Sequence, residues 1–198
     1  MKIIQLIIVL FISSISLTQI QRVKFNDASF ENGMLYPVVV IERSQENADK
    51  INTHLQAQIQ DLKEADFCIG QFGYVQKGKH IQIHIFCNCI DFEESQNRYY
   101  LYNAETGENV HYVNIIDPHK TKNAIAFFEK KAETYAELNS IKLSAADKKL
   151  ISSNSIDAFI VVFKREGVDL WLKTESWGEK PLFIAWVEMH KIMKYAFL

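Results

Sequence analysis

The sequence contains few glycines and prolines, the residues that interrupt helices and strands. Its 198 residues include only 7 glycines and 3 prolines, which excludes collagen-like chains and argues against long flexible linkers. Hydrophobic residues make up 48% and charged residues 23%, a composition too apolar for intrinsic disorder and typical of a globular domain. We therefore expect one folded domain to fill most of the chain.

An excess of charge of one sign is also missing. Lys and Arg number 22 while Asp and Glu number 24, so the formal net charge is −2. Proteins that bind nucleic acids rely on a strongly basic surface, because they must neutralise backbone phosphates. We expect no nucleic-acid partner.

Long hydrophobic runs are absent except at the N-terminus, where Lys2 is followed by an apolar run (6–12) and then by small polar residues. This order is typical of a secretory signal peptide, which we predict at residues 1–18, with cleavage near Thr18–Gln19. An uncleaved N-terminal anchor is the alternative. No later stretch approaches the roughly 20 apolar residues of a spanning helix. We expect an exported protein, periplasmic or extracellular, with no membrane span after cleavage and in an oxidising space.

The pattern of residues 19–198 predicts a single α+β domain. Apolar residues at three- and four-residue spacings predict an amphipathic helix over 48–62, and Asp117-Pro118 is typical of the start of a second helix, ending near 139. We expect an antiparallel sheet built from hairpins, with two main helices packed on one face and a short C-terminal helix. The expected hairpins pair 66–75 with 80–92, 98–102 with 108–114 and 158–164 with 168–173; a strand at 182–186 and a helix at 187–195 follow.

The three cysteines are few, but two of them can pair. A two-residue turn at Lys77-Gly78 would place Cys68 directly opposite Cys87, with Cα atoms roughly 4.5–5.5 Å apart, a distance that suits a disulfide. We predict the bond Cys68–Cys87 and a free Cys89. A bulge or a longer turn would make Cys68–Cys89 the pair, and three reduced cysteines are the other alternative.

No arrangement of residues predicts a metal site, a cofactor or a catalytic centre. Cys87 and Cys89 lie near His80 and His84, but on a strand the two histidines are roughly 13 Å apart, too far to share a zinc ion. The sequence has no Gly-x-Ser-x-Gly motif and no glycine-rich phosphate loop. If the protein is an enzyme, His80, His84 and Glu93 are the first residues to test.

Aromatic residues offer candidate binding positions. Tyrosines gather in the expected hairpin over 98–114, and aromatic rings can stack on sugars or hold a protein partner, although core packing is the commoner role. Trp177 lies beside Gly178 in an expected loop, and we therefore predict that it is exposed. The candidate binding residues are Trp177, Tyr100 and Tyr102.

Several short segments, in this order, resemble a known arrangement. They are Tyr36-Pro37-Val38-Val39 before a helix with Ile51-Asn52, the Thr-Gly hairpin over 102–110 before a Pro-capped helix, and the hairpin over 163–168 before a loop with Gly178. This order resembles the paired domains of unknown function in PdaC-like and RsiV-like bacterial envelope proteins. The first accompany peptidoglycan deacetylases, and the second form the extracellular part of a lysozyme-sensing anti-sigma factor.

The sequence also departs from that family. Residues 114–118 stand where the family usually has a Leu-x-Asp-Leu-Phe-like segment, and there is no anti-sigma segment and no room for a deacetylase domain. The resemblance therefore implies the fold and an envelope setting, with no site residue carried over. We expect an exported binding module whose partner is peptidoglycan glycan or a lysozyme-like protein. An envelope-acting hydrolase or deacetylase-related enzyme with an unrecognised site is the alternative, and an accessory domain with no ligand is a third.

Overall fold

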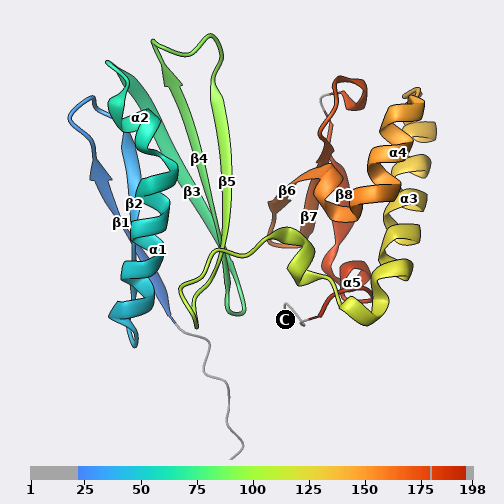
Figure 1. The fold of residues 1–198 in the computed structure, drawn as a ribbon, viewed down its shortest axis with the longest axis horizontal. Coiled ribbons are helices and arrows are strands. Elements are labelled where there is room, and N and C mark those ends of the chain that lie inside the picture. Colours follow the sequence, from blue (N-terminus) through green and yellow to red (C-terminus); the bar gives the residue numbers. More distant parts are fainter. Residues whose placement is uncertain (1–21, 179, 195–198) are drawn as a thin grey trace, which may run out of the picture.

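The structure is a computed structural model that describes residues 22–178 and 180–194; the expected signal peptide at 1–18 lies outside this range. It confirms an α+β fold of antiparallel hairpins, several helices and a short C-terminal helix, although the hairpins form three sheets where the sequence suggested one (Figure 1). The strands are β1 (Val23–Ser29), β2 (Leu35–Ile41), β3 (Cys68–Lys77), β4 (His80–Cys89), β5 (Gln96–Asn103), β6 (Phe159–Phe163), β7 (Gly167–Leu172) and β8 (Leu182–Ala185).

The helices connect and cover these sheets, whose strand orders are β1-β2, β3-β4-β5 and β6-β7-β8. The α-helices are α1 (Gln45–Gln58), α2 (Gln60–Glu64), α3 (Thr121–Leu138), α4 (Ala145–Asn154) and α5 (Trp186–Met189). The 3-10 helices are η1 (Tyr112–Ile115), η2 (Pro118–Lys120), η3 (Ser155–Ala158) and η4 (Glu175–Trp177).

The first half of the chain, residues 22–110, is built around α1. This helix lies against β2 and one face of the β3–β5 sheet (Figure 1). The apolar stripe predicted from the sequence is the buried one: Ile51 and Leu55 of α1 meet Ile81, Ile83 and Ile85 of β4 in one hydrophobic core. Period two along β4 sends these isoleucines to the α1 side and the intervening residues to the other face.

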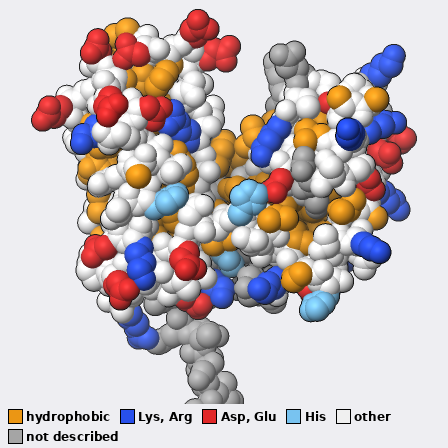
Figure 2. Space-filling view, viewed as in Figure 1, with side chains coloured by type: hydrophobic (Ala, Val, Ile, Leu, Met, Phe, Trp, Pro, Cys, Tyr) orange, Lys and Arg blue, Asp and Glu red, His pale blue; other side chains and the backbone are white. Residues whose placement is uncertain are grey.

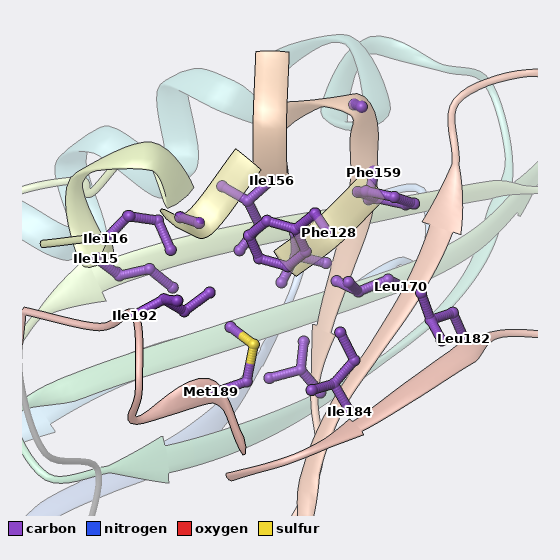
Figure 3. Packing of buried hydrophobic residues seen from close by; sticks show 14 of the residues in the cluster. Ile115, Ile116, Phe128, Ile156, Phe159, Leu170, Leu182, Ile184, Met189 and Ile192 are labelled. Atoms are coloured by element: carbon purple, nitrogen blue, oxygen red, sulfur yellow. The ribbon is translucent and has the colours of Figure 1, made fainter. Parts of the chain in front are cut away.

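The second half has its own hydrophobic core. Figure 3 shows Phe128 of α3 facing Phe159 of β6 and Leu170 of β7, with the short C-terminal segment closing the core below them. The predicted helix start is confirmed, because the Asp117 side chain accepts a hydrogen bond from the His119 amide at 3.0 Å. The first turn after Pro118 is 3-10, and α3 follows directly.

Gln82 of β4 joins the two halves. Its side chain is 2% exposed and lies on the face of the sheet opposite α1. The amide nitrogen donates to Val161 O at 2.7 Å and to the Tyr112 hydroxyl, and the amide oxygen accepts from Phe163 N at 2.7 Å. Since β6 is an edge strand, its outer backbone groups have no neighbouring strand, and the Gln82 side-chain amide forms hydrogen bonds with two of them.

The predicted disulfide Cys68–Cys87 is wrong. The bond joins Cys68 and Cys89, whose Cα atoms are 4.1 Å apart, and Cys87 is the free, buried cysteine. The cause is the turn: Lys77 pairs with His80, so the two-residue loop is Gly78-Lys79, one position later than expected. Gly78 takes the left-handed conformation there, with φ +53°.

Two expected elements also differ. No strand forms over 108–114; apart from one bridge, Tyr102 to Asn109, the chain turns away into η1 and crosses to the second half. The turn before it is held against α1: Gly107 has φ +73°, and a Cβ there would be 2.7 Å from Asn47 O. The expected helix over 187–195 is reduced to the four residues of α5.

Candidate functional site

One face of the β3–β5 sheet is not covered near the start of β3 and the end of β4. Because side chains alternate along a strand, residues next to the buried Cys68 and Cys89 point away from α1. The result is an exposed row: Ile90 is 74%, Ile69 67% and Phe67 48% exposed. We call this surface, with the half-buried residues that continue it along β4 and β5, the open sheet face. Its members are Phe67, Ile69, His84, Phe86, Ile90 and Tyr99.

A ring stack forms the centre of the open sheet face. His84 and Tyr99 are paired across β4 and β5, and their rings stack with centroids 4.4 Å apart and an interplanar angle of 10°. His84 Nε2 also lies 3.0 Å from Asn97 Oδ1, which fixes the imidazole orientation. Burial raises the pKa of the Tyr99 hydroxyl, so this residue stays neutral. The stack is thus a flat, rigid platform.

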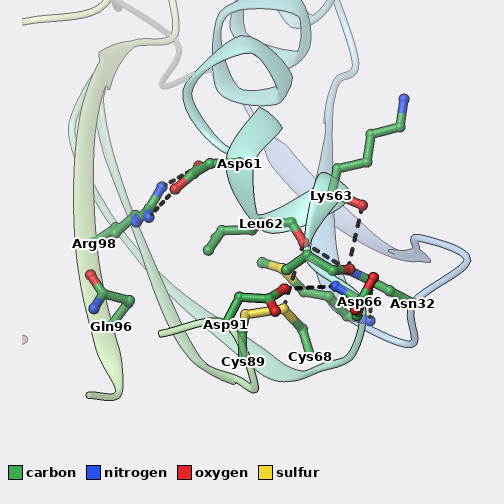
Figure 4. Close-up of a disulfide and its surroundings, with 12 residues drawn as sticks. Asn32, Asp61, Leu62, Lys63, Asp66, Cys68, Cys89, Asp91, Gln96 and Arg98 are labelled. Atoms are coloured by element: carbon green, nitrogen blue, oxygen red, sulfur yellow. Dashed lines mark hydrogen bonds and ion pairs between the residues drawn. A yellow bond between two sulfur atoms is a disulfide. The ribbon is translucent and has the colours of Figure 1, made fainter. Parts of the chain in front are cut away.

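The disulfide holds the exposed end of this face together (Figure 4). It ties the first residue of β3 to the last residue of β4, directly beside Phe67 and Ile90. The ladder continues past it, since Ile90 N donates to Phe67 O at 3.1 Å. The Asn32 amide donates to Leu62 O at 2.7 Å and to Ala65 O at 2.9 Å, so the loop before β3 is also fixed. Exposed apolar side chains therefore stand on a rigid base.

Acidic residues surround this end of the sheet. Figure 2 shows red side chains gathered over the end of the first half where α2 lies in Figure 1. Asp61 is neutralised by two hydrogen bonds from Arg98, at 2.6 and 2.8 Å, which hold its pKa below the usual range. The other carboxylates here are exposed, and we call them the acidic rim. It consists of Glu64, Asp66, Asp91, Glu93 and Glu94.

The acidic rim belongs to a wider asymmetry between the halves. Residues 22–110 hold 8 Lys and Arg against 13 Asp and Glu, whereas residues 111–198 hold 13 against 11. The small net charge of the whole chain therefore hides a first half of −5 and a second half of +2. The open sheet face lies in the acidic half, and charge of this size steers the approach of a partner.

The three aromatic residues predicted to bind are packed into the protein. Trp177 is 1% exposed, so the prediction that it is exposed is wrong: its ring stacks on Tyr135, with centroids 4.7 Å apart. Tyr102 is fully buried and its hydroxyl lies 3.0 Å from His54 Nδ1. Tyr100 is half-buried against the α1 core, with its hydroxyl 3.4 Å from Gln58 O. Tyr99, their neighbour, faces the open side instead.

The residues suspected of catalysis do not come together. His80 is buried near the β3–β4 turn, where burial lowers its pKa to about 4. His84 lies on the open sheet face and Glu93 in the loop after β4, at the opposite end of the strand from His80. In residues 22–178 and 180–194, no three His, Cys, Asp or Glu side chains are placed to hold a metal ion. None of the described helices is long and apolar enough to cross a membrane.

The sequence did contain a signal for the open sheet face. Ile69, Phe86 and Ile90 occupy positions that should be polar if only one face of the sheet were buried. His80 and His84 occupy the same strand face and give it a polar character in the sequence. Apolar residues on both faces of β3 and β4 are the sequence signal of this surface.

Comparison with known proteins supports the fold. No family model matches the sequence, and no curated protein is detectably similar to it. The structure is similar to the crystal structure of a DUF3298 family protein from Pseudomonas aeruginosa PAO1, with a TM-score of 0.52. The match covers 90% of this chain and 96% of that chain, at 10% sequence identity. The chain thus has a fold similar to that of a DUF3298 family protein.

Proposed function

We propose that this chain is an exported binding module of a bacterial envelope, which holds a basic, lysozyme-like protein on the open sheet face. The observation that carries the proposal is the exposed apolar row on a disulfide-braced sheet. Monomeric proteins rarely leave such a row uncovered, and exposed apolar patches with polar surroundings mark interaction sites. A disulfide fits an oxidising compartment.

The charge around the face selects the kind of partner. An exposed apolar row with an acidic rim around the same end of the sheet matches a partner that presents apolar side chains within a basic surface. Peptidoglycan glycan, the other partner that the PdaC-like and RsiV-like resemblance offers, brings no positive charge to this rim. The open sheet face therefore favours a protein of the lysozyme kind.

Binding to an immobilised mature chain, residues 19–198, would test the proposal with a purified basic lysozyme as the probe. Full burial of an isoleucine side chain in an interface contributes about 1.5–3 kcal/mol. We expect the double variant Ile69→Gln/Ile90→Gln to bind at least tenfold more weakly. Both positions are exposed, so the free energy of unfolding should change by less than about 0.5 kcal/mol for each.

The matched control is Val187→Gln, which makes the same kind of change at a 72% exposed position in the other half. It should bind as the unchanged protein does. Two results would contradict the proposal: no saturable binding of lysozyme by the mature chain, or equal binding by the double variant.

A further inference from the structure

A hollow of ≈ 320 Å³ lies in the second half, far along the chain from the open sheet face. It is bordered by the C-terminal end of α3 and by the loop that contains η4. The lining residues are Tyr135, Asn139, Ile141, Trp177, Gly178 and Lys180. The proposed protein partner does not use this site, and no comparison assigns it a role.

An aromatic platform forms one wall of the hollow. Tyr135 is half-buried and stacks on Trp177 at 4.7 Å with an interplanar angle of 16°, while Phe159 meets Trp177 edge-on from the core at 5.8 Å. The Tyr135 hydroxyl donates to Lys180 O, which fastens the loop after η4 against α3. Tyr135 is therefore held rigidly, with the uncovered part of its ring bordering the hollow.

The same wall contains a hydrogen-bond donor that has no acceptor. The indole nitrogen of Trp177 is buried. Among the described residues, it is the only buried side-chain nitrogen or oxygen that has no hydrogen-bond partner. An unpaired buried N–H is costly, so native structures usually pair such a donor, with an ordered water or a ligand where no protein acceptor is near. The next residue is Gly178, and nothing lies within 4 Å of where its Cβ would be. Gly178 therefore leaves open space beside the loop that carries the buried indole.

The backbone on the opposite side of the hollow is strained. Ser140 has φ +56°, the left-handed conformation that favours glycine at the end of a helix. This turn places Asn139 and Ile141 on the rim. The side-chain nitrogen of Asn139 donates to Tyr135 O at 2.9 Å, and this hydrogen bond fixes the orientation of the side-chain amide. The side-chain oxygen of Asn139 can then accept a hydrogen bond from a ligand hydroxyl.

We infer that this hollow is a subsite for an N-acetylated amino sugar, as in envelope glycans. A pyranose ring packs on a tyrosine face, its hydroxyls bond to Asn139 and Lys180, and its acetamido carbonyl supplies the neutral acceptor for the Trp177 indole N–H. The sequence prediction that Trp177 binds through an exposed ring is thus replaced by Tyr135 as platform and Trp177 as donor.

The test is a titration of the ¹⁵N-labelled mature chain, observed through its tryptophan indole signals. The Trp177 signal is assigned with Trp177→Phe. The probe is the trisaccharide of N-acetylglucosamine, and cellotriose, which lacks the acetamido groups, is the matched control. We expect a saturable downfield shift of the Trp177 indole proton with the first sugar and at least a tenfold weaker response with the second.

Variants locate the site on the Tyr135 face. Tyr135→Phe keeps the ring and should bind within threefold of the unchanged protein, whereas Tyr135→Leu should bind at least tenfold more weakly. Leu138→Ala, at an 80% exposed position on the same helix, should have no effect. An unmoved Trp177 indole signal in the unchanged protein, or equal shifts with both sugars, would overturn the inference even if a variant fails to fold. Because no lysozyme is present, this outcome is independent of the proposed protein partner.

Discussion

Replacing Gln82 by leucine tests whether the two halves depend on one side chain. Leucine has a similar volume but no polar atoms, so the change removes the bonds to Val161, Phe163 and Tyr112 while the junction stays filled. Gln82 is 2% exposed, so water does not replace these bonds without opening the junction. Leaving a buried donor or acceptor unpaired costs about 1–3 kcal/mol, and we expect a loss of about 3 kcal/mol in the free energy of unfolding.

Such a loss is a large share of the roughly 5–15 kcal/mol that stabilises a typical domain. It is measured by urea unfolding, together with hydrogen exchange at the Phe163 amide, which should become faster. The control Gln71→Leu makes the same change on the same sheet at an exposed position and should alter stability by less than about 0.5 kcal/mol. If Gln82→Leu is as stable as this control and the Phe163 amide exchanges as before, the junction does not depend on Gln82.

Other predictions concern covalent structure, pH and backbone geometry. Changing Cys68 and Cys89 together to alanine should lower the free energy of unfolding by about 3 kcal/mol, and mass analysis of the unchanged protein should show one disulfide and one thiol. Burial lowers the pKa of His80 to about 4, so as the pH falls the unfolded state binds a proton at His80 before the folded state does. The free energy of unfolding should therefore fall from about pH 6.5 towards pH 4, and His80→Gln should flatten this part of the stability–pH profile. Gly107→Ala should cost about 2 kcal/mol or more in urea unfolding, because it adds a clash with α1 to a left-handed φ, whereas Gly78→Ala adds only the φ penalty of about 1 kcal/mol.

The sequence predicted the two main helices, whose signals were local. The stripe over 48–62 gives α1 and α2, and the Asp117 cap marks the start of η2 and α3. The disulfide required a register, and here the hydrophobic pattern could not help. Moving the turn by one residue shifts each pairing by two positions, which leaves every side chain on its original face. Cys87 and Cys89 share that face, so only the turn geometry at Gly78 distinguishes them.

The position of Trp177 could not be predicted from neighbouring residues. Its loop has the composition of an exposed turn, but Ser176 donates to the buried Asp147 carboxylate at 2.7 Å and draws the loop onto the start of α4. Burial alone would raise the pKa of Asp147; the hydrogen bonds from Ser176 and Ser144 outweigh it and bring the pKa to about 2. The ionised Asp147 thus holds the loop that buries Trp177, a contact between residues far apart in sequence.

Charge and apolar contact should act on different steps of binding at the open sheet face. The net charge of −5 on residues 22–110 attracts a basic partner before contact, and salt screens this attraction because the Debye length is about 8 Å at physiological ionic strength. The apolar row acts only after contact, when water has left it. In surface-binding kinetics with lysozyme, Glu93→Gln/Glu94→Gln should lower the association rate severalfold at low salt and leave the dissociation rate unchanged. Ile69→Gln/Ile90→Gln should raise the dissociation rate and leave the salt dependence of association intact. If both variants change the same rate constant, the acidic rim and the apolar row do not have separate roles.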